Sequence, residues 1–199
     1  MKLLLIRHPA VAVAAGVCYG ASDIELADGW QSWCEQVKAL VNAIDGDVAC
    51  VSSPLSRCLH PARYLGRDVS PDLRLREMNF GDWEGAAWSD IAVDEITRWN
   101  ADLMTVAPPN GESLGQMRAR TEEFLSAARG FEGDALVAMT HAGPIRCLLA
   151  SILGMDPSQL FRLRVDLGSV STVTLGESGD VLEFMNLRLQ STATAASGA

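Results

Sequence analysis

Three short runs of apolar residues constrain this fold more than any other feature of the sequence: residues 3–6, 48–51 and 135–139. Each run is continuous rather than alternating, and each stops abruptly at polar or charged residues. Short continuous runs of this kind are typical of strands that are buried on both faces of a parallel sheet. Parallel neighbours need long crossover connections, so helices are expected between the strands.

Helical periodicity is present in the segments between these runs. Apolar side chains, among them Trp30 and Trp33, recur at helical spacing across residues 29–44. Further helices are expected over 57–65, over 112–129 and from residue 145 to 153, and a late pair of strands over 170–175 and 181–187. This alternation predicts an α/β fold, with a mostly parallel central sheet and helices on both faces.

Residues 71–111 differ in character from the rest of the chain. They hold three of the five tryptophans and a Pro-Pro-Asn-Gly break at 108–111. We interpret them as a lid-like excursion from the sheet with one short helix. A length of 199 residues suits one domain, which is expected over 1–189, and the small polar residues 190–199 are expected to form a disordered tail.

Composition excludes several classes of function. The formal net charge is −9, which argues against nucleic acid or an anionic membrane as a partner. No apolar stretch approaches the roughly 18 residues that a membrane span needs. The five cysteines are an odd number, widely spaced and without a Cys-x-x-Cys pair, so a secreted disulfide scaffold is not indicated. The sequence therefore predicts a cytoplasmic protein.

Arginines and histidines follow the three apolar runs. Arg7 and His8 come directly after the first, Arg57 comes soon after the second, and His141 follows the third. In open α/β sheets, ligands bind outside the carboxyl ends of the strands. If the three strands are neighbours, these side chains form a cationic pocket in an otherwise acidic chain. A phosphomonoester dianion fits such a pocket, because arginine forks match phosphate oxygens.

A histidine in this pocket can also act as a nucleophile. Neutral imidazole attacks phosphorus, and arginines neutralise the charge that repels the attack. The leaving alkoxide needs a proton, and Glu77, Asp82 and Glu84 lie among bulky apolar residues, where a carboxyl group can keep a proton and donate it. The residues alone do not choose among these three. The chemistry needs no metal and no other cofactor.

Other polar residues are interpreted as structural. His60 lies inside an expected helix and shows no zinc-ligand spacing with the nearby cysteines, so no metal site is predicted. Three arginines are interpreted as exposed helix or loop residues: Arg63, Arg76 and Arg146.

Residues 111–115 match the Gly-x-Ser-x-Gly pattern of a serine-hydrolase nucleophile elbow. That elbow requires a strand immediately before it. Here Pro-Pro-Asn at 108–110 precedes the pattern, so we expect the start of a helix, with Ser113 or Asn110 as its cap.

Four motifs resemble the histidine phosphatase superfamily, also called phosphoglycerate mutase-like. They are Leu5-Ile6-Arg7-His8, Ser52-Ser53-Pro54-Leu55-Ser56-Arg57, the acid-bearing loop over 75–85, and Thr140-His141-Ala142-Gly143-Pro144. They occur in the family's order from residue 3 to about 175. The resemblance implies the phosphoglycerate mutase-like fold and a metal-independent phosphomonoesterase with a phosphohistidine intermediate on His8. It further implies phosphoryl binding by Arg7, Arg57 and His141, and it selects Glu77 as proton donor.

Within the family, the segment 17–23 and the loop over 82–85 are most similar to the α-ribazole phosphatase branch of cobalamin biosynthesis. This implies a phosphorylated, nucleotide-like small molecule as substrate, bordered by Tyr19 and Gly20. Pro9-Ala10-Val11 stand where the family usually has Gly-Glu-Thr or Gly-Glu-Ser, which counts against mutase activity.

Several alternatives remain at this point. The first is a phosphoglycerate mutase or a phosphatase of broad small-molecule specificity. The second is a catalytically silent phosphate-binding protein. The late strand pair is a candidate surface for a homodimer.

Overall fold

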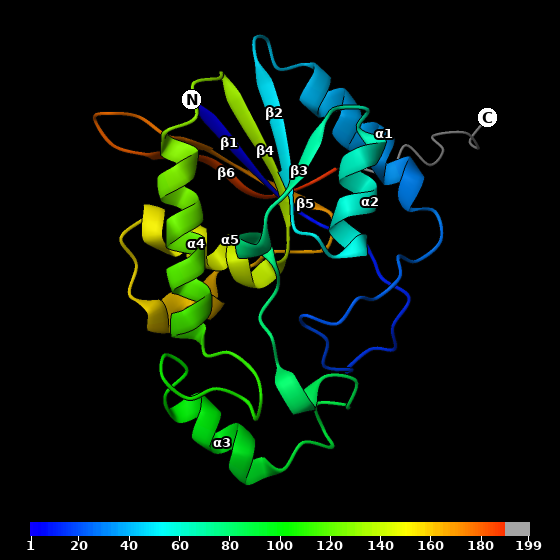
Figure 1. The fold of residues 1–199 in the computed structure, drawn as a ribbon, viewed down its shortest axis with the longest axis vertical. Coiled ribbons are helices and arrows are strands. Elements are labelled where there is room, and N and C mark those ends of the chain that lie inside the picture. Colours follow the sequence, from blue (N-terminus) through cyan, green and yellow to red (C-terminus); the bar gives the residue numbers. More distant parts are fainter. Residues whose placement is uncertain (190–199) are drawn as a thin grey trace, which may run out of the picture.

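A central sheet of six strands organises the molecule (Figure 1). The computed structural model describes residues 1–189, so the tail expected over 190–199 lies outside the described residues. The strands are β1 (Lys2–Arg7), β2 (Val48–Ser52), β3 (Val69–Pro71), β4 (Ala135–Thr140), β5 (Ser169–Thr174) and β6 (Val181–Arg188). Their order is β3-β2-β4-β1-β5-β6. The first four pair in parallel, whereas β5 pairs antiparallel with both β1 and β6. The predicted mostly parallel sheet is confirmed.

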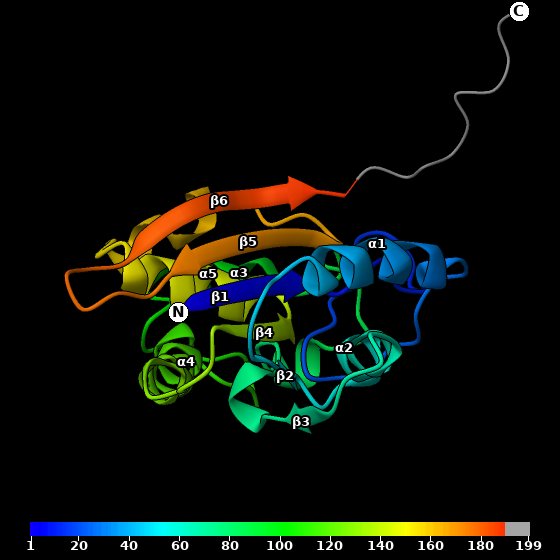
Figure 2. The same ribbon diagram turned by 90° about the horizontal axis from the view of Figure 1, so that it is seen from above.

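Helices cover both faces of the sheet, as predicted. Figure 2 shows α1 (Trp30–Asn42) and α2 (Ser56–Tyr64) on one side, and α4 (Leu114–Arg129) and α5 (Ala142–Ile152) on the other. In β1, Leu3 and Leu5 pack toward α4 and α5, whereas Leu4 and Ile6 join the core under α1 and α2. Successive strand residues point to opposite faces, so a strand buried on both faces needs a continuous apolar run.

The short strand β3 has no counterpart among the predicted elements. It is three residues long and follows no apolar pattern, with exposed Ser70 and Pro71. It lies at the edge of the sheet, where proline is tolerated because one side of the strand needs no hydrogen-bond partner.

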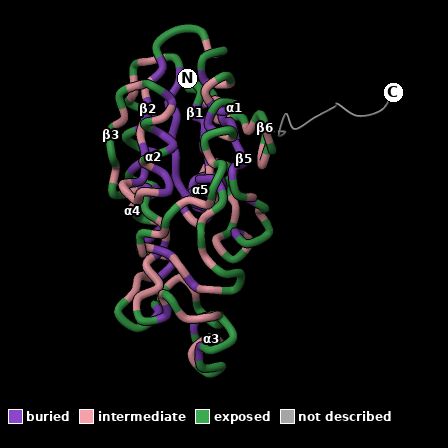
Figure 3. The backbone as a smooth tube through the Cα atoms, turned by 90° about the vertical axis from the view of Figure 1, so that its right-hand side faces the viewer, coloured by how far each residue is buried: buried purple, intermediate pink, exposed green. Residues whose placement is uncertain are grey.

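The excursion over 71–111 lies beyond the carboxyl ends of the parallel strands (Figures 1 and 3). It contains two short 3₁₀ turns (Leu73–Leu75 and Gly81–Trp83) and one α-helix, α3 (Val93–Ala101), in agreement with the expected single short helix. Trp83 and Trp99 are buried and pack with ring centroids 5.6 Å apart. Two of the three tryptophans therefore form the core of the excursion itself.

The excursion is hydrogen-bonded to the loop that follows β1. The Cys18 amide donates to the Ala86 carbonyl over 2.8 Å, and the Gly85 amide donates to the Cys18 carbonyl over 2.8 Å. These bonds form part of a small bridge between Val17 and Ala87. The two irregular segments thus support one another at the open end of the sheet.

The Gly-x-Ser-x-Gly match is the start of α4. Ser113 is the N-cap residue, its hydroxyl accepts from the Gln116 amide, and the Gln116 side chain accepts in return from the Ser113 amide. This reciprocal capping box satisfies two amides that the helix leaves free. Ser113, the serine of the Gly-x-Ser-x-Gly match, is therefore the N-cap of α4, as predicted.

We expect Ser113→Ala to lower the free energy of unfolding by about 1 kcal/mol, because it removes the N-cap acceptor. Urea unfolding measures the change. Ser126→Ala, at an exposed position inside the same helix, is the matched control and should change stability by less than about 0.5 kcal/mol. Equal effects of the two substitutions would contradict the capping role.

Candidate active site

Strand order brings the predicted phosphate-binding residues together. β2, β4 and β1 are consecutive parallel neighbours, so their carboxyl ends share one edge of the sheet, facing the excursion (Figure 1). Arg7 ends β1, His141 follows β4, and Arg57 stands in the first turn of α2. The rings of His8 and His141 lie with centroids 5.1 Å apart. The neighbour relation on which the cationic pocket depends is confirmed.

His8 is a buried ring with a defined tautomer. Its Nδ1 lies 2.7 Å from the Pro9 carbonyl oxygen, which can only accept, so Nδ1 carries the proton and Nε2 keeps its lone pair. Burial and the charge of Arg57 lower the pKa of His8 from 6.5 to about 3, although the Pro9 carbonyl opposes the shift. A neutral imidazole with a free Nε2 is the form that attacks phosphorus.

The unusual residue after His8 keeps this contact. Proline lacks the backbone N–H but retains its carbonyl oxygen, and that oxygen is what His8 Nδ1 meets. The departure from the family's usual glycine therefore does not disturb the tautomer of His8. Ala10 and Val11 supply no polar side chain to the loop.

His141 is held in the opposite tautomer. Arg57 Nε donates to His141 Nδ1 over 3.2 Å, so the ring proton is on Nε2, which lies 2.8 Å from the Ser53 hydroxyl. Burial, followed by the nearby charge of Arg57, holds the pKa of His141 well below 6.5. The two neutral histidines thus offer different groups: a lone pair on His8 and an N–H on His141.

Arg57 is fully buried at the centre of this arrangement. Beside its bond to His141, Nη1 donates to the Ser22 carbonyl over 2.6 Å and Nη2 to the Gly20 carbonyl over 2.5 Å. The guanidinium carbon lies 5.5 Å from the centroid of the Tyr19 ring. The structure therefore places Tyr19 and Gly20 against Arg57, and their bordering of a substrate stays a prediction.

Gly20 is required by a close approach of two backbones. A Cβ atom at this position would lie 1.9 Å from the Met78 carbonyl oxygen and 2.7 Å from the Phe80 ring. Only glycine lets the loop come near enough for its carbonyl to accept from Arg57.

Arg7 retains hydrogen-bonding capacity. Its Nη1 donates to the Val165 carbonyl over 2.7 Å. Its Nε is buried and, within residues 1–189, has no hydrogen-bond partner. Buried donors are normally satisfied, so this N–H is suited to a phosphoryl oxygen.

Glu77 lies at the start of α5. Its Oε1 accepts from the Met78 amide over 3.0 Å, and its Oε2 accepts from the Gly143 amide over 3.2 Å. Gly143 is two residues after His141, so the carboxyl group is held at the first turn of the helix that follows this histidine. A Cβ atom on Gly143 would stand 2.2 Å from Glu77 Oε1.

The other two carboxylates of this loop have different places. Glu84 accepts hydrogen bonds from the amides of Ala21, Ser22 and Phe80 and from the Ser22 hydroxyl. It therefore links the excursion to the loop after β1, whose carbonyl groups accept from Arg57. Asp82 is exposed and accepts from the Asn110 side chain over 2.9 Å. Of the three candidates, Glu77 is the one placed at the start of α5.

Two of the three arginines expected at the surface are exposed, Arg63 and Arg76. The expectation for Arg146 is wrong. This residue is half-buried, its Nε donates to the Leu163 carbonyl over 2.9 Å, and it lines a small cavity together with Glu77. Its position in a predicted helix gave no sign that the 3₁₀ helix Pro157–Arg162 and Leu163 pack against it.

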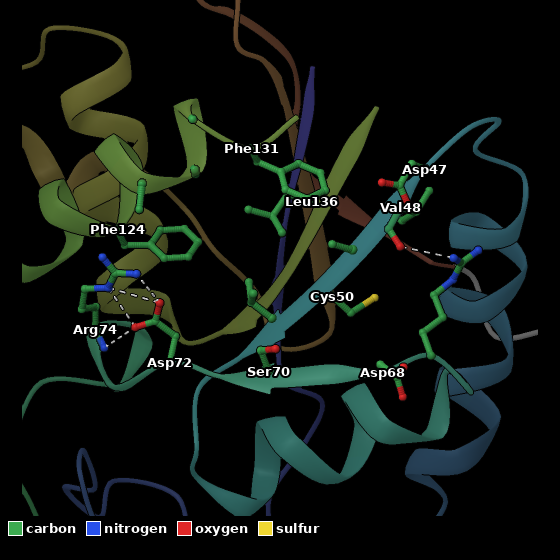
Figure 4. A pocket seen from close by; sticks show the side chains of 16 residues that line it. Asp47, Val48, Cys50, Asp68, Ser70, Asp72, Arg74, Phe124, Phe131 and Leu136 are labelled. Carbon is green, nitrogen blue, oxygen red and sulfur yellow. Dashed lines mark hydrogen bonds and ion pairs between the residues drawn. The ribbon is translucent and has the colours of Figure 1, made fainter. Parts of the chain in front are cut away.

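The largest hollow lies elsewhere. It has a volume of about 660 Å³ and opens between α4 and the strands β2 and β3. Figure 4 shows its apolar floor, with Leu136 and Phe131, and the ion pair of Asp72 with Arg74 at its rim. None of the predicted site residues lines it, so the largest hollow and the site are separate.

Residues 1–189 contain neither a membrane-spanning helix nor a cluster of metal ligands. None of the helices there has the length and apolarity that a membrane crossing requires. No group of three or more His, Cys, Asp and Glu side chains in that part of the chain could hold a metal ion.

Similar proteins identify the family. The family model for the histidine phosphatase superfamily (branch 1) matches residues 3–188. The chain belongs to the histidine phosphatase superfamily. Among curated proteins, the adenosylcobalamin/α-ribazole phosphatase of Salmonella typhimurium is 30% identical over 198 residues, which cover 94% of this chain and 97% of that protein. A bifunctional protein of Mycobacterium tuberculosis is 33% identical over 183 residues, covering 85% of this chain and 49% of that protein.

Solved structures agree with this assignment. The α-ribazole phosphatase from Shigella flexneri superimposes on this histidine phosphatase with a TM-score of 0.85 and 26% identity, over 94% of this chain and 97% of that one. A mycobacterial glucosyl-3-phosphoglycerate phosphatase gives a TM-score of 0.81 and 25% identity, over 93% and 98%. The predicted family and fold are confirmed, and the mutase and silent-binder alternatives are not favoured.

We expect His8 and His141 to remain neutral in the ligand-free enzyme down to pH 5.5, because burial and Arg57 lower both pKa values. Ring ¹⁵N shifts, assigned with His8→Gln and His141→Gln, should show the proton on Nδ1 of His8 and on Nε2 of His141. A titration of either ring near pH 6.5 contradicts the expectation.

The lowered pKa values of His8 and His141 also affect the stability of the fold. Unfolded histidines bind a proton near pH 6.5, whereas the folded His8 and His141 bind one only at lower pH. The free energy of unfolding should therefore fall as pH drops below 6.5, by up to about 1.4 kcal/mol per pH unit for each histidine.

Proposed function

We propose that this protein is a metal-independent phosphomonoesterase that works through a phosphohistidine on His8, and that its substrate is α-ribazole phosphate or its corrinoid-linked form. The observation that carries the proposal is the neutral His8 with Nε2 free. Its Nδ1 proton is held by the Pro9 carbonyl, and Arg57 and His141 stand beside it.

In the first step, His8 Nε2 attacks phosphorus and the bond from phosphorus to the ester oxygen breaks. Arg7, Arg57 and the Nε2–H of His141 bind the charged phosphoryl oxygens. The leaving alkoxide takes a proton from the carboxyl group of Glu77.

In the second step, water replaces the released alcohol. The Glu77 carboxylate takes a proton from this water, whose oxygen attacks phosphorus as the phosphorus–nitrogen bond breaks. Inorganic phosphate leaves, and both His8 and Glu77 return to their starting states.

The substrate class rests on similarity. The relative from Salmonella typhimurium is named adenosylcobalamin/α-ribazole phosphatase and is matched over nearly its whole length. The solved α-ribazole phosphatase from Shigella flexneri has the same fold over 94% of this chain. A phosphatase of broad small-molecule specificity is not favoured by these relatives.

We also propose one catalytic domain over residues 1–189, a cytoplasmic location and a homodimer. All five cysteines are free and buried, which suits a reducing compartment. The edge strand β6 exposes Phe184 and Leu187, which suits contact with a second copy. Sedimentation analysis with and without Leu187→Glu tests the dimer.

Phosphate release from a panel of monoesters in EDTA tests the proposed function. The panel contains α-ribazole phosphate and the phosphoglycerates. We expect the wild type to favour α-ribazole phosphate, and His8→Ala to lose at least about 1,000-fold in kcat, as nucleophile removal does elsewhere. His60→Ala, at the exposed histidine, is the control and should keep full activity.

Other outcomes of this panel are equally decisive. Interconversion of phosphoglycerates without release of phosphate would mean a mutase. Binding of vanadate without turnover of any ester would mean a silent binding protein. Turnover that persists in His8→Ala would remove His8 as the nucleophile.

Gly143→Ala should inactivate the enzyme without unfolding it. The new methyl group would occupy the position of Glu77 Oε1, which is the mobile end of a side chain and can move aside. Misplacing a general acid costs on the order of 100-fold in kcat. Gly130→Ala, where the nearest atom to a Cβ is 3.5 Å away, is the control. Full activity of Gly143→Ala would contradict the placement of Glu77.

A further inference from the structure

The backbone that carries Glu77 has little regular structure of its own. The residue lies between the 3₁₀ turns Leu73–Leu75 and Gly81–Trp83. A proton donor must be held near its acceptor within hydrogen-bonding distance, and small displacements of a reacting group are costly. Groups outside the segment must therefore fix its position.

Arg120 of α4 binds this backbone at three carbonyl groups. Its Nη1 donates to the carbonyl oxygens of Arg74 and Arg76, both over 2.6 Å, and its Nη2 donates to the carbonyl oxygen of Glu77 over 3.2 Å. The side chain is 17% exposed. One planar guanidinium thus spans the peptide groups on both sides of Glu77.

Glu112 completes the attachment. It forms a bidentate ion pair with Arg120, at 2.6 Å to Nη2 and 3.2 Å to Nε. Its Oε1 also accepts from the Asn79 amide over 3.0 Å, and its own amide donates to the Asn79 carbonyl over 2.8 Å. The ion pair therefore holds the segment at residues 74–77 and again at residue 79.

We propose that Arg120 and Glu112 are positioning residues for Glu77, a role that rests on the proposed function. Within residues 1–189 they form no hydrogen bond to the phosphoryl-binding groups or to His8, although the charge of Arg120 contributes to the lowered pKa of His141. They fix the peptide from which the Glu77 side chain reaches the amide of Gly143. Their contribution belongs to the two proton transfers of Glu77, to the leaving group and from the attacking water, and not to the attack of His8 on phosphorus.

Substrates with different leaving groups distinguish protonation of the leaving group from the attack of His8 on phosphorus. An alkoxide is a poor leaving group and needs a proton as its bond to phosphorus breaks. p-Nitrophenolate is a stable anion and leaves without one. A defect in the position of Glu77 should therefore slow hydrolysis of an alkyl phosphate much more than hydrolysis of p-nitrophenyl phosphate.

The test compares kcat/KM of Arg120→Lys and Glu112→Gln on α-ribazole phosphate and on p-nitrophenyl phosphate. This ratio reports the steps up to release of the alcohol and leaves out the later water step, which both esters share. Lysine cannot span three carbonyls with one ammonium group, and glutamine breaks the ion pair while keeping an amide oxygen for Asn79. We expect losses of about 10- to 100-fold on the alkyl ester and less than about 3-fold on the aryl ester. Vanadate affinity should not change. Glu77→Gln should show the same pattern with a larger loss.

The same helix supplies a matched control. Arg118 and Glu122 form an exposed ion pair at 2.7 Å, with side chains 34% and 45% exposed. Arg118→Lys and Glu122→Gln should leave kcat/KM on both esters unchanged.

Three outcomes overturn the inference. Equal losses of kcat/KM on both esters would mean that the half-buried pair serves stability alone, and no loss on either would mean that Glu77 is held without it. A wild type that hydrolyses neither ester would instead refute the proposed function, and the inference with it.

Discussion

Arg57 is a fully buried guanidinium, and most of the site follows from the need to satisfy it. A buried cation is costly unless its donors are paired. The carbonyl oxygens of Gly20 and Ser22 and the Nδ1 atom of His141 take this role. To bring those carbonyls in, the loop after β1 must approach the excursion, which explains both the glycine at position 20 and the amides that Glu84 accepts.

The same cation determines the charge states of the histidines. Two imidazoles in contact with arginine, away from water, cannot readily be protonated, so both rings are neutral when no anion is bound. Their tautomers are then decided by their neighbours, a carbonyl acceptor for His8 and an N–H donor for His141. A phosphoryl dianion would meet a lone pair for attack and an N–H for charge stabilisation within one pocket.

The excursion is the second half of the catalytic framework. It has a small aromatic core and is hydrogen-bonded to the loop after β1. It carries Glu77, while α4 supplies the ion pair of Arg120 and Glu112 that grips the neighbouring peptides. The proposed nucleophile and the proposed proton donor thus depend on separate supports: the strand ends for His8, and a helix and irregular backbone for Glu77.

The sequence by itself determined the sheet, the helices and the grouping of Arg7, His8, Arg57 and His141. Continuous apolar runs report burial on both faces, and parallel neighbours place their carboxyl ends at one edge. The choice of Glu77 over Asp82 and Glu84 came from the family resemblance, because three carboxylates in one loop look alike without coordinates.

Tertiary structure alone decided which partners each group meets. The strand β3, the burial of Arg146, the tautomers of the two histidines and the attachment of Arg120 to the peptides around Glu77 all depend on contacts between residues distant in sequence. No local pattern encodes such contacts. A side chain's hydrogen bonds are set by whatever backbone the fold brings against it, and that is known only once the chain is packed.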